Sequence, residues 1–310
     1  MIKRGAYGCV LKPSISCKNK VINQEKTVSK VFEIEDYYEE ELAIYEIMKI
    51  IDPERKYTLS KLDECSLSKI PKEAILKCKY KFSEFPKKQI IYEYGGIDLS
   101  ELIKTNYDIK SLMPGIINIV DGLISLDNAG YCHRDIKETN IVFKNNKFYL
   151  IDFGLLIKFD NLYDEDQDYV LRFNYCYYPP EFKIYYNYKL TQTNITSIYD
   201  LKKFTVADVK LNYTKSLYVY DDEVITKSVS KVLDFMKNID IVKVTMTQSA
   251  NKVDIFGFGM VLIKLITNAN SNSELLKLQL LKISEKCIEI NSWFRYSPKK
   301  LKKELLKLNY

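Results

Sequence analysis

The sequence has little glycine, proline and arginine, and hardly any histidine or tryptophan. Its 310 residues include 10 glycines, 8 prolines, five arginines, one histidine and one tryptophan. So few glycines and prolines exclude collagen-like and low-complexity chains. The rest of the composition is ordinary, with 46% hydrophobic and 28% charged residues. This length predicts two domains or one large bilobal unit, with enough chain for a substantial core.

The cysteines have no paired spacing. There are seven of them, an odd number, and none forms a C-x-x-C motif. This pattern argues against a disulfide framework and against a zinc site. It predicts a reducing compartment, and we therefore expect a cytoplasmic protein.

A long hydrophobic run is also missing. The most apolar segment, residues 255–266, is interrupted by Lys264 and is too short to span a bilayer. The first residues show no apolar signal core and Ile2 excludes N-myristoylation, so we expect no leader and no membrane partner.

The net charge of +6 is mild, and the lysine run at 299–307 is typical of a solvated helix face. We therefore expect no nucleic-acid partner.

Hydrophobic periodicity predicts alternating short strands and helices. Strands are expected at 28–32, 89–94, 141–143 and 148–151, and helices at 36–51, 99–104 and 111–128. The turn Asn145-Asn146 predicts a hairpin between the last two strands. Residues 185–250 are polar with little core pattern, and the last 55 residues are expected to be helical.

The most informative stretch is His133-Arg134-Asp135-Ile136-Lys137-Glu138-Thr139-Asn140, an H-R-D-x-K-x-x-N loop. Asp152-Phe153-Gly154 follows after the predicted hairpin. A single D-F-G would be weak, but the order of loop, hairpin and D-F-G resembles the eukaryotic-type protein kinase family.

The resemblance implies a role for each polar residue of this stretch. Asp135 would accept the proton of the substrate hydroxyl, and Lys137 would stabilise charge on the transferred phosphoryl group. Asn140 and Asp152 offer hard oxygen ligands for Mg²⁺. His133, the only histidine, would pack and anchor the backbone and would not act as a base.

Residues 5–10 resemble the last two-thirds of a glycine-rich phosphate loop. Gly5 and Gly8 would let the backbone approach the nucleotide phosphates, with Ala6, Tyr7 and Val10 completing the cofactor-binding segment. The first glycine of the family pattern is replaced by Lys3, so the loop is truncated.

Val28-Ser29-Lys30 resembles the strand that carries the phosphate-binding lysine, and Lys30 lies at the right distance from the glycines. Its partner should be a glutamate on the next helix. Four are available: Glu39, Glu40, Glu41 and Glu46. We favour Glu41, because the apolar residues of the helix then face inward, and we expect the other acids to form a solvated face.

Residues 92–99 resemble the connection between the two lobes of a kinase. Tyr92 would occupy the gatekeeper position, and the backbone of Glu93 and Gly95 would contact the adenine. Asp98 would contact the ribose hydroxyls. A strand that ends in a Gly-Gly turn explains the same residues without a nucleotide.

The later part of the chain carries weaker family elements. Pro179-Pro180-Glu181 resembles A-P-E, and residues 254–259 resemble the start of a central buried helix. Arg295 resembles the late arginine that pairs with the A-P-E glutamate, here Glu181. The resemblance covers residues 3–184 and 252–310.

The segment after D-F-G departs from the family. It has no serine or threonine before Pro179, and residues 163–169 form an acidic cluster. We hypothesise that this cluster replaces a phosphate opposite Arg134, although a solvated acidic loop explains it equally well. Asn174 stands where the family has a threonine. About 60 extra residues, at 186–250, form an insert that either binds an unknown partner or is a floppy excursion of the chain.

These observations predict an α+β, bilobal protein-kinase fold with a small β-rich N-lobe (1–94) and a larger, mainly helical C-lobe (95–310). The implied function is an ATP- and Mg²⁺-dependent serine/threonine protein kinase, since Lys137 is typical of serine/threonine specificity. The alternative is a pseudokinase that binds ATP and acts as a scaffold through its insert. A small-molecule kinase is disfavoured by the A-P-E-like element. Composition and layout resemble kinases of large nucleocytoplasmic DNA viruses, which would place the protein in the host cytoplasm or the virion.

Overall fold

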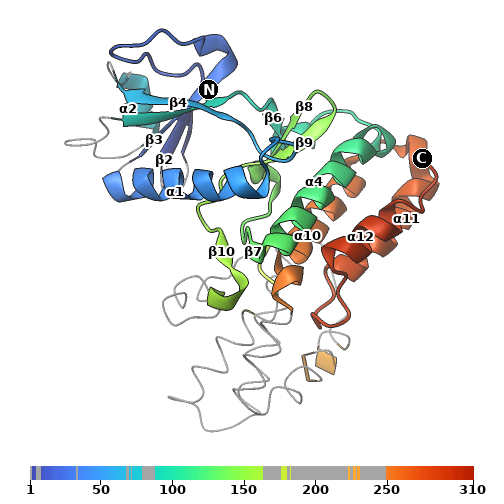
Figure 1. The fold of residues 1–310 in the computed structure, drawn as a ribbon. Helices are drawn as coiled ribbons and strands as arrows, with labels where there is room; N and C mark the ends of the chain where they lie inside the picture. Colours follow the sequence, from blue (N-terminus) through green and yellow to red (C-terminus); the bar gives the residue numbers. More distant parts are fainter. Residues whose placement is uncertain are drawn as a thin grey trace.

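The computed structural model has a β-rich part, at upper left in Figure 1, and a helical part beside and below it. The structure describes residues 2–4, 8–32, 34–67, 70, 72–78, 88–162, 176–179, 182, 223, 226–227, 229–230 and 249–310. This arrangement confirms the predicted α+β, bilobal kinase fold. The predicted insert at 186–250 lies almost wholly outside the described residues.

The β-rich part is built on one antiparallel sheet of five strands in the order β1-β2-β3-β5-β4. The strands are β1 (Ile2–Arg4), β2 (Gly8–Leu11), β3 (Thr27–Phe32), β4 (Lys61–Ser66) and β5 (Lys88–Glu93). In β3, Val28 and Lys30 are half-buried, while Thr27, Ser29 and Val31, which alternate with them, are buried. Since side chains alternate along a strand, Val28 and Lys30 share the face that is turned toward the helical part.

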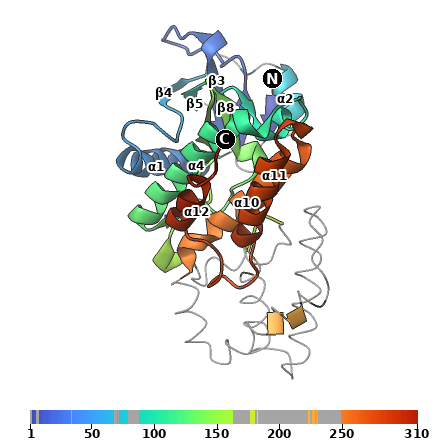
Figure 2. The same ribbon diagram turned by 90° about the vertical axis from the view of Figure 1, so that its right-hand side faces the viewer.

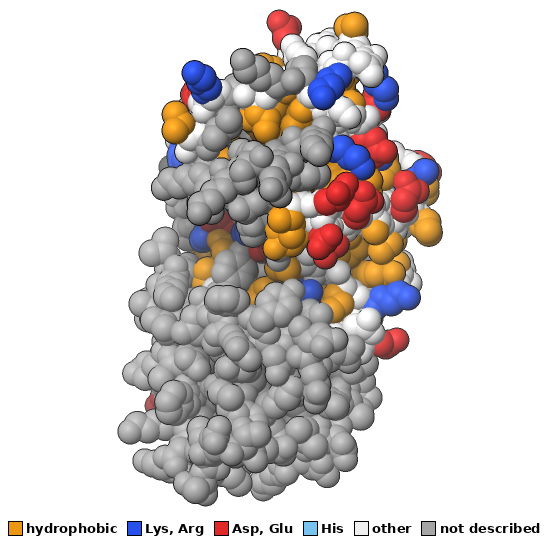
Figure 3. Space-filling model, turned by 90° about the vertical axis from the view of Figure 1, so that its left-hand side faces the viewer, with side chains coloured by type: hydrophobic (Ala, Val, Ile, Leu, Met, Phe, Trp, Pro, Cys, Tyr) orange, Lys and Arg blue, Asp and Glu red, His pale blue; other side chains and the backbone are white. Residues whose placement is uncertain are grey.

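Helix α1 (Glu35–Ile51) crosses the lower side of the sheet in Figure 1, where the spacing of apolar residues predicted a helix. Only Tyr38 and Met48 of its 17 residues are buried. Acidic side chains gather on the face of the β-rich part drawn in Figure 3, and the exposed acids of α1 include Glu39 and Glu40. The expectation of a solvated acidic face on this helix is therefore confirmed. A shorter helix, α2 (Lys72–Cys78), was not predicted.

The helical part begins with α3 (Leu99–Leu102) and α4 (Ile109–Ala129). Helix α4 begins at the cap Asp108, whose carboxylate accepts from the N–H of Lys110, and ends at Gly130, where φ is +75°. Its 21 residues and mean hydropathy of 1.4 would suffice to cross a bilayer. Ten of those residues, however, are buried, as expected of a core helix.

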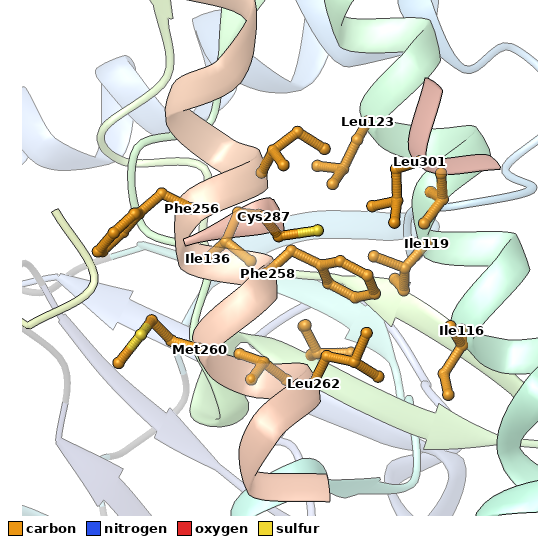
Figure 4. Close-up of a cluster of buried hydrophobic side chains, with 14 of the residues drawn as sticks. Ile116, Ile119, Leu123, Ile136, Phe256, Phe258, Met260, Leu262, Cys287 and Leu301 are labelled. Carbon is orange, nitrogen blue, oxygen red and sulfur yellow. The ribbon is translucent and has the colours of Figure 1, made fainter. Parts of the chain in front are cut away.

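Among the described residues of this part there are also α10 (Val253–Asn268), α11 (Glu274–Cys287) and α12 (Pro298–Leu305). Figure 2 shows them beside α4 below the sheet. Helix α10 is central, because 13 of its 16 residues are buried. Figure 4 shows Phe258 and Leu262 of α10 against Ile116 and Ile119 of α4, so that apolar side chains from distant segments meet in one core.

Short strands form two smaller sheets, in the orders β6-β8-β9 and β10-β7. They are β6 (Ile97–Asp98), β7 (Tyr131–Cys132), β8 (Ile141–Lys144), β9 (Lys147–Leu150) and β10 (Ile157–Lys158). The predicted hairpin is β8–β9, and Asn145 and Asn146 have φ of 52° and 60°, as a tight two-residue turn requires. Gly96 precedes β6 with φ +86°, and a Cβ there would lie 2.0 Å from the carbonyl oxygen of Phe143.

The cysteine prediction was wrong. Cys9 of β2 is bonded to Cys78 of α2, with Cα atoms 6.0 Å apart, and Cys17 is bonded to Cys65 of β4, with Cα atoms 5.8 Å apart. The partners are 69 and 48 residues apart in sequence, so no local spacing motif could indicate them. Because two disulfides are present, the cysteine argument for a reducing compartment no longer holds.

Candidate active site

A cavity of about 1040 Å³ lies between the sheet and the helical part. Most of the residues predicted to bind nucleotide, to act in catalysis or to hold a metal line it: Gly8, Val10, Lys30, Glu41, Glu93, Gly95, Asp98, Asp135, Lys137, Asn140 and Asp152. Gly5, Ala6 and Tyr7 lie outside the described residues. The structure thus brings together groups that are up to 144 positions apart (8 to 152) in one concave site.

Lys30 lies at the inner end of this cavity between two carboxylates. Its Nζ donates to Oε2 of Glu41 at 2.8 Å and to Oδ1 of Asp152 at 3.1 Å. The lysine and Glu41 side chains are only 12% and 13% exposed. Burial alone would lower the pKa of Lys30, but Asp152 and Glu41 outweigh it and raise that pKa above its ordinary value. Lys30 is therefore a permanent cation, and its glutamate partner is the one favoured from the sequence.

Asp135, Lys137 and Asn140 form a second polar cluster in the loop that follows β7. Nζ of Lys137 and Nδ2 of Asn140 both donate to Oδ2 of Asp135, at 2.8 and 2.7 Å. Nδ2 of Asn140 also donates to the backbone oxygen of Asp135 at 3.0 Å. These bonds fix the direction of the Asp135 carboxylate, as a base that must meet a hydroxyl requires.

Asp254, the second residue of α10, holds the backbone of this loop. Its carboxylate accepts from the N–H of His133 at 2.7 Å and from the N–H of Arg134 at 2.8 Å. Burial raises the pKa of Asp254, although these bonds and nearby cations oppose the shift. Arg134 has φ +62°, a backbone conformation that costs energy for a non-glycine residue and persists where its surroundings impose it. Sequence reasoning predicted the helix start here but missed this anchoring role.

His133 is fully buried and contacts other residues through its ring. Its Nε2 lies 3.2 Å from the backbone oxygen of Ile151, and its Nδ1 accepts from the N–H of Asp135 at 3.3 Å. The ring also packs on Phe153, with centroids 4.6 Å apart. These contacts agree with the predicted packing and anchoring role.

The end of β5 and the residue after it are bound by hydrogen bonds of both the backbone and the side chain of Glu93 and of the backbone of Tyr94. The N–H of Glu93 donates to Ser60 and the N–H of Tyr94 donates to Lys26, at 3.1 and 2.9 Å. The Glu93 carboxylate accepts from Lys144 at 2.6 Å. Lys144 and the N–H of Ser60 lower the pKa of Glu93 despite its partial burial. The segment that was predicted to face adenine is therefore rigidly placed.

Asp98 has a structural task that the sequence prediction missed. Its Oδ1 accepts from the N–H of Glu101 at 3.0 Å and from the Ser100 hydroxyl at 2.5 Å, so that it caps α3. The residue lines the cavity but is only 5% exposed. The Asp98 carboxylate, which caps α3, is thus held in the wall of the cavity.

A third polar cluster was not predicted. Nζ of Lys264 in α10 donates to Oε1 of Glu138 at 2.7 Å and also contacts the hydroxyl of Tyr177, which donates to Oε2 of Glu138. Glu138 follows Lys137 directly, so this cluster ties the loop at residues 133–140 to α10. In the sequence Lys264 only interrupts an apolar run.

Several predicted elements cannot be placed. The acidic cluster at 163–169, Asn174 and the Pro180-Glu181 pair lie outside the described residues. Of their expected partners, Arg134 donates through Nε to the backbone oxygen of Leu155 at 2.7 Å. Arg295 donates to the backbone oxygens of Glu289 and Lys252.

The sequence agrees with the geometry on the class of protein. The family described as "Protein kinase domain" matches residues 5–198, which is more than half of the chain. The chain therefore belongs to the protein kinase family.

Two relatives make the likeness more specific. The chain is 36% identical over 100 residues to the "Probable serine/threonine-protein kinase fnkB" of Dictyostelium discoideum. It is 39% identical over 70 residues to the "B1 kinase" of Vaccinia virus (strain Copenhagen). These alignments cover 31% and 21% of this chain. They span 19% and 23% of the two relatives, about a fifth of each.

Proposed function

We propose that the protein is an ATP-dependent serine/threonine protein kinase that transfers the γ-phosphate to protein hydroxyls. The observation that carries the proposal is that Lys30, Asp135, Asn140 and Asp152 all line one cavity. Phosphoryl transfer needs positioned charges more than covalent chemistry. This cavity supplies a buried cation, a carboxylate with a fixed direction, and further oxygen atoms that can bind a metal ion.

Each residue has a task that its contacts permit. Asp135, with its carboxylate held by Lys137 and Asn140, would accept the proton of the substrate hydroxyl. Lys137 is 27% exposed at its side chain and would stabilise charge on the phosphoryl group as it moves. Lys30, held between Glu41 and Asp152, would bind the nucleotide phosphates.

Asp152 and Asn140 fit a magnesium ion. Lys30 holds the pKa of Asp152 below its ordinary value despite burial, so that the carboxylate is ionised. Asn140 uses its amide nitrogen toward Asp135, which leaves the amide oxygen for a cation. Among the described residues no cluster of three or more His, Cys, Asp or Glu could hold a metal. Mg²⁺ does not need one, because it usually takes one or two carboxylates with phosphate oxygens and water. When bound, the ion would neutralise phosphate charge.

Transfer of labelled phosphate from ATP to a generic acceptor protein tests the proposal. We expect Asp135→Ala to lower the rate by about 1000-fold and Lys30→Ala by about 100-fold. Lys49→Ala, on the exposed side of α1, should leave the rate unchanged, since the Lys49 side chain is 61% exposed. Phosphoamino-acid analysis should find phosphoserine or phosphothreonine.

The alternative is a pseudokinase scaffold, which the truncated glycine-rich loop favours. It predicts that the wild type and all three variants bind ATP, and that the wild type transfers no more phosphate than Asp135→Ala does. That result would contradict the kinase proposal. Phosphotyrosine alone would contradict the assignment of substrate class from Lys137.

A further inference from the structure

Tyr92 contacts the same carboxylate as Lys30. Its hydroxyl donates to Oε1 of Glu41 at 3.0 Å, while Lys30 donates to Oε2 at 2.8 Å. Both oxygens of Glu41 are therefore bound, one by β5 and the other by β3. Lys30 alone was expected to hold this glutamate, so the sequence gives no reason for the second bond.

The sheet register places the two donors side by side. Lys30 lies opposite Ile90, and Tyr92 lies opposite Val28, on adjacent antiparallel strands. Because alternate residues share a face, Lys30 and Tyr92 are diagonal neighbours on the face turned to α1 and the cavity. Both residues line that cavity.

Apolar and polar contacts together position helix α1. Tyr38 and Met48 are its buried residues, and Leu42, Ile44 and Ile51 pack against buried clusters. Lys30 also has Asp152 as a second carboxylate partner. If α1 moved away, Lys30 would keep Asp152 but Glu41 would lose its cation, so a second donor to Glu41 adds to the restraint on the helix.

The hydroxyl of Tyr92 remains a donor at all physiological pH values. Burial, followed by the charge of Glu41, raises the pKa of Tyr92 well above its ordinary value of 10.0. A protonated phenol against a carboxylate makes a charge-assisted hydrogen bond, which is among the stronger kinds in proteins.

We propose that Tyr92 is a positioning residue, whose hydroxyl holds Glu41 and with it α1 in the place where Glu41 pairs with Lys30. The inference rests on the proposed kinase function, because the Lys30–Glu41 pair matters for phosphate binding. Through this bond Tyr92, near the end of β5, is coupled directly to the position of α1.

Tyr92→Phe tests the proposal, because it removes the hydroxyl and keeps the ring. We expect kcat for phosphate transfer to fall about tenfold, which is the loss of one hydrogen bond to a charged group. In the Glu41→Ala background the same change should have less than a twofold effect, since the acceptor through which Tyr92 acts is already gone. Tyr149→Phe, on β9 outside the cavity, is the matched control and should change nothing.

Hydrogen exchange provides a measurement that does not depend on activity. Tyr92→Phe should speed amide exchange within α1 by about tenfold, and Tyr149→Phe should not. If the wild type transfers no phosphate, the kinase proposal fails while the exchange experiment still decides the role of Tyr92. Unchanged exchange in α1 would overturn the inference, as would equal losses of kcat in the wild-type and Glu41→Ala backgrounds. A general loss of stability in Tyr92→Phe would appear in both backgrounds and is thereby separated from positioning.

Discussion

Glu138 and Lys264 form an ion pair whose side chains are only 17% and 21% exposed. Burial alone would raise the pKa of Glu138, but the bonds from Lys264 and Tyr177 outweigh it and hold that pKa below its ordinary value. Burial, together with the same carboxylate, raises the pKa of Tyr177. At the residue scale, the charge states of Glu138 and Tyr177 thus depend on the neighbours that this cluster gives them.

Lys264→Met should destabilise the protein by about 2 kcal/mol at neutral pH, because it leaves Glu138 buried without its cation. The folded-state pKa of Glu138 lies below its unfolded value near 4.5, so the pair stabilises the fold above that pH and ceases to do so as the pH falls. Urea unfolding at pH 7 and pH 4 should therefore show a smaller difference between variant and wild type at the lower pH.

Lys49→Met is the control for this experiment. Lys49 pairs with Glu46 at 3.4 Å, but both side chains are more than 60% exposed. Its loss should cost less than about 0.5 kcal/mol. Equal losses for the two variants would show that burial of the Glu138–Lys264 pair contributes nothing.

Helix α10 joins the apolar core to the loop at residues 133–140, which carries Asp135. Asp254 in its first turn binds the backbone of that loop, and two glycines further along let other segments approach closely. A Cβ on Gly257 would lie 2.8 Å from the backbone oxygen of Ile136, next to Asp135. A Cβ on Gly259 would lie 2.7 Å from Cβ of Cys287 in α11. The two glycines therefore face different neighbours.

Gly257→Ala and Gly259→Ala form a matched pair that separates catalysis from packing. Each should lower the free energy of unfolding by about 1–3 kcal/mol, because each added methyl group overpacks the core. Only Gly257→Ala displaces the loop that carries Asp135, so its kcat should also fall about tenfold below that of Gly259→Ala. Urea unfolding and phosphate transfer, measured where both variants are folded, provide the comparison. Equal kcat values would contradict the role assigned to α10.

At the scale of the whole molecule, the two parts are stabilised differently. The helical part has a large apolar core around α10, whereas the buried clusters of the β-rich part are small. Both disulfides lie in the β-rich part, where they close long loops. Cross-links of this length restrict the unfolded chain and stabilise a fold by about 2–4 kcal/mol each.

Alkylation in denaturant followed by mass spectrometry tests the disulfides. Without reductant, only Cys132, Cys176 and Cys287 should be modified, because the other four cysteines are paired. With reductant, all seven should react. Modification of all seven without reductant would restore the prediction made from the cysteine spacing.

Local patterns predicted a large share of the fold. Apolar spacing placed α1 and α4, and Asn145-Asn146 placed the β8–β9 hairpin, because helices, strands and tight turns depend on residues near one another in the chain. The order of the kinase motifs indicated the family and most of the residues that line the cavity. The helical face of residues 36–51 favoured Glu41 as the partner of Lys30, which is the pairing that the structure shows.

Only the tertiary structure decided the contacts between distant segments. The bond from Tyr92 to Glu41 spans 51 residues, Lys264 reaches Glu138 across 126, and Cys9 pairs with Cys78 across 69. None of these pairs shares a helix face or a strand register that a short window of sequence could show. Their meeting depends on how the sheet, α1, α2 and α10 pack together. That packing is driven by burial of apolar surface, which is non-directional and does not specify any single one of these pairs in the sequence.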